Sequence, residues 1–272
     1  MLHLKYFYFH LTEQLIKVLS KLGFRETVPL SLDTDKYKSQ CVYKNRLYVI
    51  SRKTVNALGA PDVMFGDIAV NTGLQNADPC TERGCKWFKR RDGTVSVPYV
   101  ISNQFSSRER RVIEDAMKSF QSSTCVRFVP RQREQDYILI RSLDGCFSFV
   151  GRRGGGQILS LNRNGCVFFG VVQHELLHAL GFNHEQTRSD RDQHVRILFQ
   201  NVIRGQEHNF QKIRTLNLDT PYDYNSIMHY GRFAFSRNRE PTIIPIPNSN
   251  AVIGRATEMS RVDIQRINRL YC

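Results

Sequence analysis

The chain has 272 residues and a mass of 31.6 kDa, enough for one large domain or two small ones, which excludes a solenoid or a miniprotein. With 41% hydrophobic and 24% charged residues, its composition is typical of a folded protein and not of a disordered one. No run approaches 18 apolar residues, so we expect no membrane-spanning helix. The net charge is +14, and seven cysteines leave at least one thiol outside any set of intramolecular disulfides.

The first 20 residues contain an apolar stretch that is too interrupted for an export signal. Only residues 6–9 are continuously apolar, because Lys5, His10 and Glu13 break the run, whereas a signal needs roughly 7 to 15 such residues. We therefore predict no clear signal peptide. The apolar spacing over residues 11–22 favours an amphipathic helix instead.

The distribution of cysteines and charged residues changes near residue 75. Residues 1–75 hold one cysteine, Cys41, with ten Lys and Arg against six Asp and Glu, whereas residues 76–272 hold six cysteines with 29 against 19. An even cysteine set in the second segment favours an oxidised, secreted module with three disulfides, behind a removable prefix that carries the odd thiol. The alternative is a cytosolic enzyme with reduced cysteines.

The second segment predicts an α+β fold. Strands are expected over residues 95–101, 125–129 and 137–140, where β-branched and aromatic residues alternate or cluster. Between the first two, a helix over residues 107–122 is capped by Ser106 or Ser107 and carries apolar residues at helical spacing.

A glycine-rich segment, residues 151–156, is expected to turn between strands at 146–150 and 157–161. It is no phosphate-binding loop, because it lacks the Gly-Lys-Ser/Thr ending that opens a helix. Regular signals become rare after residue 190, until a last helix ends at Cys272. That helix opens with a capping box from Ser260 to Asp263, in which Asp replaces the usual Glu.

The chemistry is concentrated in the eleven residues from His174 to His184, H-E-L-L-H-A-L-G-F-N-H. His174 and His178 lie four apart, so a helix places both on one face, where they can share a metal ion. Gly181 is expected to end the helix and let the chain return His184 as a third ligand. Three neutral imidazoles leave a fourth position for water, as in a catalytic zinc site, and Glu175 is then the expected general base of peptide hydrolysis.

Apolar residues from Phe168 to Leu180 flank these histidines and predict that the helix is buried and dry. The alternative is a buried helix with two incidental histidines. It is disfavoured because three of the chain's eight histidines fall within eleven residues at fixed offsets.

The same string matches the metzincin signature, which also requires a methionine turn, and the segment S-I-M-H-Y at residues 226–230 supplies one. With residues 174–192, H-E-L-L-H-A-L-G-F-N-H-E-Q-T-R-S-D-R-D, the chain resembles the astacin family of zinc endopeptidases. The resemblance implies a two-lobed catalytic domain. Its upper lobe has a twisted mixed sheet with two long helices, and its lower lobe is mostly irregular with a C-terminal helix.

The resemblance also assigns the site. It implies one Zn²⁺ per chain, with His174, His178 and His184 as metal ligands and Met228 as an apolar floor below them. Tyr230 would be an extra ligand at rest and would turn to the tetrahedral intermediate when substrate binds. By its own chemistry a phenol near zinc can do either, and without the motif Tyr230 is one of eleven tyrosines.

Residues 76–87, 149–157 and 270–272 resemble the fish hatching enzymes of this family, most of all the low choriolytic type, which digests the egg envelope. This likeness implies a secreted, monomeric endopeptidase of egg-envelope (chorion) proteins, with residues 1–75 as a pro-segment and 76–272 as the catalytic domain. It also selects one of the 15 pairings that six cysteines allow. The implied disulfides are Cys125 with Cys272, Cys146 with Cys166, and Cys80 with Cys85, although the last two residues are free thiols in the alternative.

Residues 64–68, M-F-G-D-I, resemble the family's F-x-G-D inhibitory motif, in which the aspartate replaces the catalytic water on zinc. Asp67 is therefore the candidate zymogen switch, although Met64 stands where the family has Phe. Without the resemblance, Gly66 and Asp67 are a turn. In the family, the position of Glu185 meets the new N-terminus after activation, so the resemblance implies a pair with that amine or with an arginine, and the alternative is solvent.

Three alternatives to a hatching enzyme remain open: a digestive astacin, a matrix-processing astacin, or a non-enzymatic cationic module with structural zinc. Glu175 argues against the last, because a structural site has no use for a base. Basic residues are dispersed and lack the aromatic interleaving of nucleic-acid surfaces, so we expect no nucleic acid as partner. The lack of a long apolar run leads us to expect no membrane partner either. The positive charge is interpreted as attraction to an acidic protein or glycoprotein substrate, and an arginine in the cleft wall would favour acidic side chains.

Overall fold

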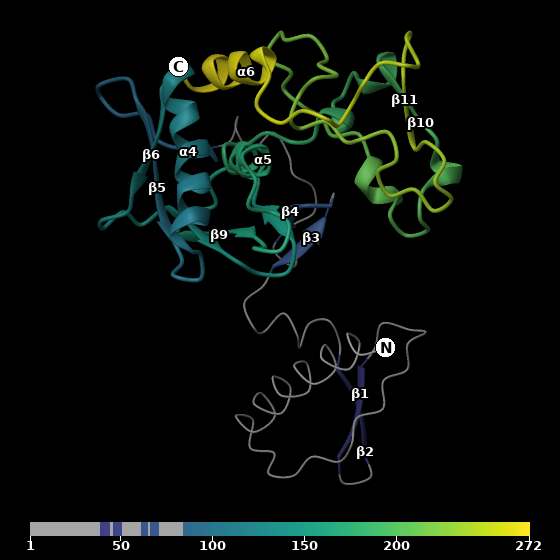
Figure 1. Cartoon of the computed structure of the whole chain (residues 1–272), viewed down its shortest axis with the longest axis horizontal. Coiled ribbons are helices and arrows are strands. Elements are labelled where there is room, and N and C mark those ends of the chain that lie inside the picture. Colours follow the sequence, from purple (N-terminus) through teal and green to yellow (C-terminus); the bar gives the residue numbers. More distant parts are fainter. Residues whose placement is uncertain (1–38, 44–45, 51–60, 65, 71–83) are drawn as a thin grey trace. The chain divides into compact units, whose positions relative to one another are not determined.

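The computed structural model of the chain describes residues 39–43, 46–50, 61–64, 66–70 and 84–272 (Figure 1). The chain divides into two units, Met1–Ala60 and Pro61–Cys272. In the first, β1 (Ser39–Tyr43) pairs antiparallel with β2 (Arg46–Ile50). The predicted helix over residues 11–22 and the predicted boundary between residues 75 and 76 lie outside the described residues.

A seven-stranded mixed sheet forms the frame of the second unit. The strand order is β3-β4-β8-β9-β7-β5-β6. The strands are β3 (Asp62–Met64), β4 (Ile68–Val70), β5 (Val95–Ile101), β6 (Val126–Pro130), β7 (Tyr137–Arg141), β8 (Cys146–Ser148) and β9 (Gly156–Leu161). β5 pairs parallel with β6 and β7, and β7 with β9, while β8 runs antiparallel to β9. The expected strands are confirmed, although β8 ends at Ser148 and not at residue 150. The turn predicted over residues 151–156 lies between β8 and β9, and β9 begins at Gly156.

Two helices of this unit begin with the same capping device. In α4 (Ser107–Ser123), Ser106 caps the helix and Glu109 completes a capping box. In α6 (Arg261–Tyr271), Ser260 and Asp263 do the same, as predicted. Between them in the chain lies α5 (Phe169–Ala179), which has no side-chain cap and is mostly buried.

The main hydrophobic core joins the sheet to all three of these helices. α4 contributes Ile113, Ala116, Met117 and Phe120, and α6 contributes Ile267 and Tyr271. Phe120 meets Phe128 of β6 edge to face, with ring centroids 5.3 Å apart. The prediction that Phe168 is buried is wrong: it is 63% exposed, because it precedes the first turn of α5 and is not carried inward by the helix.

We call residues 84–180 the upper lobe and residues 181–259 the lower lobe. The lower lobe has little regular structure, as the sequence predicts. It contains four short 3₁₀ turns, η1 (Glu185–Thr187), η2 (Arg191–Gln193), η3 (Phe199–Asn201) and η4 (Glu207–Phe210), and one pair of strands, β10 (Val195–Ile197) and β11 (Ile243–Pro245). A second, smaller core lies here, formed by Val195, Val202, Phe210, Tyr222, Ile243 and Ile253.

Two disulfides have the pairing that the family resemblance implies. Cys125, just before β6, is bonded to Cys272 at the end of α6, and Cys146 of β8 is bonded to Cys166. Cys80 is outside the described residues, so the predicted Cys80–Cys85 bond lies there too. Within the described part of the chain, no helix is long and apolar enough to span a bilayer.

Candidate active site

The local structure of α5 brings two histidines together. His174 and His178 lie one turn apart, and their Nε2 atoms are 3.1 Å from each other. The helix ends at Ala179, and Gly181 follows with φ +106°, the left-handed conformation that glycine adopts at least cost. Its N–H donates to the His178 carbonyl over 2.8 Å. This turn sends the chain back so that His184 joins the other two histidines, as predicted.

Four potential metal ligands converge at this point. The ligating atoms of Asp67, His174, His178 and His184 all lie within 4.8 Å of one another. Asp67 Oδ2 is 3.1 Å from His174 Nε2, and its Oδ1 is 3.3 Å from His178 Nε2 and 2.9 Å from His184 Nε2. Three imidazole nitrogens and one carboxylate oxygen are a donor set that suits tetrahedral zinc.

Unpaired polar atoms support the fit of a metal. Asp67 Oδ1 and His184 Nε2 are buried and 2.9 Å apart, yet this contact lacks the geometry of a hydrogen bond, and neither atom makes another one within the described part of the chain. A buried polar atom without a hydrogen bond is costly, and a cation placed among these atoms would satisfy them together. The residues present therefore fit one zinc ion.

Backbone carbonyls fix the orientation of two of the imidazoles. His174 Nδ1 lies 2.8 Å from the Ile227 carbonyl, and His178 Nδ1 lies 2.8 Å from the Phe182 carbonyl. A proton on Nδ1 leaves the Nε2 lone pair free to bind a metal. Burial also lowers the pKa of His178, and lowers that of His184 to about 4, which keeps both rings neutral.

Glu175 lies beside the histidines and is 1% exposed. Its Oε2 atom makes no hydrogen bond to any described residue. Burial, and next the negative charge of Asp67, raise the pKa of this carboxyl well above its usual value. A carboxylate in such a dry setting binds a proton more readily than one in water, as a general base requires.

The turn at Gly66 places Asp67 on the histidines. Gly66 has φ +83°, and a Cβ added there would lie 2.7 Å from the Tyr230 hydroxyl, so a larger residue would not fit without a shift. Next to it, the Asp67 carbonyl accepts the Ser148 N–H over 2.9 Å, and β4 pairs parallel with β8. Burial opposes ionisation of Asp67, but the neighbouring histidines, His184 foremost, hold its pKa well below the usual value.

The methionine-turn residues Met228 and Tyr230 are both close to the third histidine segment. Met228 is 2% exposed within the main core, and its carbonyl accepts the Glu185 N–H over 3.0 Å. The Tyr230 ring centroid is 4.5 Å from that of His184. Burial, and then the charges of Asp67 and Glu175, raise the pKa of this phenol well above its usual value, so it stays protonated.

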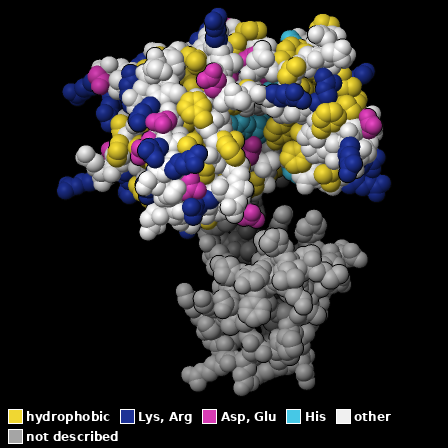
Figure 2. Space-filling view, in the orientation of Figure 1, with side chains coloured by type: hydrophobic (Ala, Val, Ile, Leu, Met, Phe, Trp, Pro, Cys, Tyr) yellow, Lys and Arg dark blue, Asp and Glu magenta, His cyan; other side chains and the backbone are white. Residues whose placement is uncertain are grey.

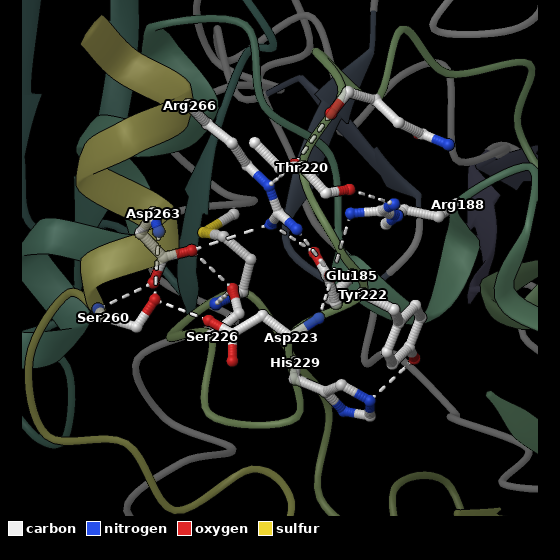
Figure 3. A network of polar contacts seen from close by, with 12 residues as sticks. Glu185, Arg188, Thr220, Tyr222, Asp223, Ser226, His229, Ser260, Asp263 and Arg266 are labelled. Atoms are coloured by element: carbon white, nitrogen blue, oxygen red, sulfur yellow. Dashed lines mark hydrogen bonds and ion pairs between the residues drawn. The ribbon is translucent and has the colours of Figure 1, made fainter. Parts of the chain in front are cut away.

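A buried polar network that sequence reasoning largely missed surrounds Glu185 (Figure 3). Glu185 is 2% exposed, so of its three expected partners the structure excludes solvent and shows an arginine. Arg266 of α6 grips both carboxylate oxygens, with N–O distances of 2.5 and 2.8 Å. Arg188 and the Asp223 N–H also contact Oε1, at 3.3 and 2.7 Å. The sequence indicated Glu185 by its place after the third histidine and offered an arginine as one partner, but nothing in it identified Arg266 as that arginine.

A cavity of about 790 Å³ opens beside His174 and Glu175. Five segments form the rest of its lining: the start of α5 with the residue before it, the methionine turn, the segment before α6, and two short stretches, one at the start of β8 and one in the N-terminal segment. These residues are Phe168, Phe169, Gly170, Val171, Ile227, Ala256, Thr257, Gly145, Cys146, Gly66 and Asp67. The charged residues of this lining are Asp67 and Glu175. The sequence leaves open an arginine in the cleft wall, but none lines this cavity among the described residues.

Comparison with known proteins agrees with this geometry. The profile of the Astacin peptidase family matches residues 85–272. High choriolytic enzyme 1 of Oryzias latipes is 53% identical over 210 residues, 77% of each chain. Low choriolytic enzyme of the same species is 48% identical over 225 residues, 82% of each chain. Identity is thus higher to the former, whereas the match to the latter is longer.

The solved structure of high choriolytic enzyme 1, a hatching enzyme zinc-protease from Oryzias latipes, superposes with a TM-score of 0.69. It is 55% identical and covers 72% of this chain and 98% of that one. The α+β fold and the zinc dependence expected from the sequence are thereby confirmed. The chain belongs to the astacin family of peptidases and is a zinc metalloendopeptidase.

Proposed function

We propose that this chain is the latent form of a secreted, monomeric endopeptidase that digests egg-envelope (chorion) proteins at hatching. His174, His178 and His184 hold zinc, and Glu175 is the general base. The observation that carries the proposal is the convergence of three histidines, of which His178 and His184 are buried and His174 is partly exposed, beside Glu175 at the edge of a cavity that can take a substrate side chain. The hatching role rests on the likeness to two choriolytic enzymes.

The chain's own residues supply the proton transfers. Zinc, when bound, acts as a Lewis acid on the scissile carbonyl and makes water acidic enough to lose a proton. Glu175 takes that proton and then delivers it to the leaving amine, which its buried position favours. The Tyr230 hydroxyl, which stays protonated, donates a hydrogen bond to the negative oxygen that develops during attack, a contribution of about 3 kcal/mol for such a donor.

Asp67 holds the enzyme inactive in this proposal. Its carboxylate lies against all three histidines and occupies the place that water and substrate need. Residues 1–75 would then be a pro-segment, and cleavage before Asn76 would remove Asp67 from the site. Cleavage at this position is compatible with a disulfide-bonded catalytic domain, since both described disulfides lie after it.

The surface charge fits an extended acidic substrate better than a single anionic ligand. Figure 2 displays Lys and Arg scattered over the face shown and not gathered in one patch. Such a distribution attracts an acidic protein or glycoprotein at low salt without fixing one binding mode. A digestive or matrix-processing role is the second candidate, and it differs in substrate and not in chemistry.

The chemistry is tested on the enzyme after activation. Hydrolysis of a peptide library should stop on chelation and return with Zn²⁺, and Glu175→Gln should lower kcat by about 100-fold or more while zinc is retained. Activity that survives both treatments would contradict the mechanism. N-terminal sequencing of the activated protein should give Asn76, and purified fish egg envelopes should be solubilised faster than casein or collagen if hatching is the role.

The switch is tested on the full chain. Asp67→Ala should give a precursor that cleaves peptides without proteolytic activation, since the carboxylate no longer covers the histidines. A precursor variant that stays silent, while its activated form works normally, would exclude Asp67 as the switch. Zinc content should be measured in both proteins, so that loss of metal is not mistaken for latency.

A further inference from the structure

The capping box of α6 departs from the usual pattern in a way that its surroundings explain. Asp263 stands where a capping box normally has Glu or Gln. In α4 the corresponding residue is Glu109, which bonds only Ser106 and Arg163 and lies near the surface. Asp263 is 2% exposed, so its side chain, which is shorter than that of Glu, makes its contacts in the protein interior.

Three donors outside the helix interior meet the Asp263 carboxylate. Its Oδ2 accepts the Ser260 N–H over 3.0 Å, which completes the cap, and also the Ile227 N–H over 3.0 Å. Its Oδ1 accepts the Ser226 hydroxyl over 2.6 Å, and Figure 3 shows Ser226, Ser260 and Asp263 joined in this way. The carboxylate therefore ties the start of α6 to the two residues that precede Met228.

Ile227 connects this anchor to the metal centre. Its N–H is held by Asp263, and its carbonyl accepts the proton on His174 Nδ1 over 2.8 Å. The orientation of the His174 ring is thus set by a residue whose own position is fixed by a buried carboxylate. Hydrogen bonds to ligating histidines commonly change metal affinity by about 10- to 100-fold.

The helix that carries Asp263, α6, is itself held in place. The Cys125–Cys272 bond fixes the end of α6, and the Tyr271 hydroxyl donates to the Leu180 carbonyl just past α5 over 2.7 Å. Arg266 of the same helix grips Glu185, the residue after His184. α6 therefore supports the metal-binding segments at both His174 and His184 without contributing a ligand.

We propose that Asp263 is a positioning residue of the zinc site, which acts through residue Ile227 to orient His174. The proposal rests on the zinc site of the proposed function. It predicts that removal of the carboxylate weakens zinc binding beyond what loss of a helix cap explains, because the Ile227 segment and then the imidazole gain freedom.

The test compares two helix caps in the zinc-loaded full chain. Asp263→Ala and Glu109→Ala each remove the acidic residue of a capping box, but only the first removes a contact to Ile227. Zinc affinity is measured by competition with a chromophoric chelator, and the Co²⁺-substituted proteins are compared by their visible absorption. We expect about tenfold weaker zinc binding and an altered Co²⁺ spectrum for Asp263→Ala, with neither change for Glu109→Ala.

Equal zinc affinities and equal Co²⁺ spectra in the two variants would overturn the proposal and leave Asp263 as a helix cap only. If Asp263→Ala does not fold, Asp263→Asn keeps the shape and one acceptor oxygen, and should give a smaller shift in the same direction. An unchanged affinity in a folded Asp263→Asn would then overturn it. Failure of the unmodified chain to bind zinc would contradict the proposed function itself, which is a separate result.

Discussion

The upper and lower lobes reach a buried interior by different means. The upper lobe satisfies its backbone through a sheet and two helices and fills its interior with apolar side chains such as Phe120, Ile140 and Leu159. The lower lobe has few regular elements, and its buried residues include Glu185, Arg188 and Arg191. Both lobes bury backbone groups that need partners, but only the upper lobe has regular elements to supply most of them.

Arginine side chains replace the missing backbone ladders in the lower lobe. Arg188 donates to the Thr220 and Pro221 carbonyls over 3.0 and 3.1 Å. Arg191 donates to the Gln186 and Phe210 carbonyls over 2.9 and 2.8 Å. A guanidinium can serve several acceptors at once, which suits an irregular chain. Part of the positive charge that the sequence suggests for substrate attraction is therefore structural.

The largest expected effect comes from the disulfides. The Cys125–Cys272 bond closes a loop of 147 residues and joins the upper lobe to α6, whereas Cys146–Cys166 closes one of 20. Chain entropy predicts a loss of about 5 kcal/mol for the Cys125→Ser/Cys272→Ser pair and about 3 kcal/mol for Cys146→Ser/Cys166→Ser. Urea unfolding of both double variants measures this. A larger loss of stability for the variant of the shorter loop would mean that strain or local packing, and not loop length, determines how much each disulfide stabilises the fold.

The next effect tests the buried charges of the lower lobe. Arg266→Met leaves Glu185 buried and without its bidentate partner, which should lower the free energy of unfolding by about 3–5 kcal/mol. Adding Glu185→Gln should recover part of that loss, because a buried amide that has lost the Arg266 contacts costs less than a buried carboxylate that has lost them. A double variant as unstable as Arg266→Met alone would show that Arg266 acts through its carbonyl contacts and not through this ion pair.

The third effect concerns the cavity, to which both lobes contribute. Its lining predicts that the activated enzyme prefers apolar side chains next to the scissile bond over acidic ones. Ala256→Arg should shift that preference toward acidic side chains by about tenfold or more in kcat/KM. Val252→Arg is the matched control, because it adds the same charge at an exposed site outside this cavity. Equal shifts of this preference in both variants would mean that the added charge acts at long range and not through the lining of the cavity.

The smallest effect lies on the surface of the upper lobe. Hydrogen bonds from Arg163, and then from Ser106, lower the pKa of Glu109 to about 2. A carboxyl whose pKa is lowered on folding stabilises the fold above its unfolded value of about 4.3, and this contribution is lost as the pH falls toward 2. The stability difference between the unmodified chain and Glu109→Gln should therefore shrink from about pH 5 to about pH 2. A stability difference between the two proteins that does not depend on pH would contradict an ionic origin of the stabilisation by Glu109.

Local patterns were enough to predict the elements of the upper lobe and the histidines of the site. The helix over residues 107–122 and the strand over residues 95–101 repeat their apolar residues at the periods of 3.6 and 2 that their geometry demands. His174, His178 and Gly181 lie within one helix and its end, so their relation follows from helix geometry. The prediction failed at Phe168, because its position one residue before the helix removes it from that periodicity.

By itself, the sequence determined the α+β class, the zinc motif, the capping box of the last helix and the family. Each of these depends on residues close in the chain or on a motif of fixed spacing. Tertiary structure alone decided that Glu185 is buried against Arg266, 81 residues away, and that Asp263 reaches Ile227. It also decided that the cavity beside Glu175 has no arginine in its described lining. These contacts depend on how distant segments meet, and no periodicity in the chain encodes that.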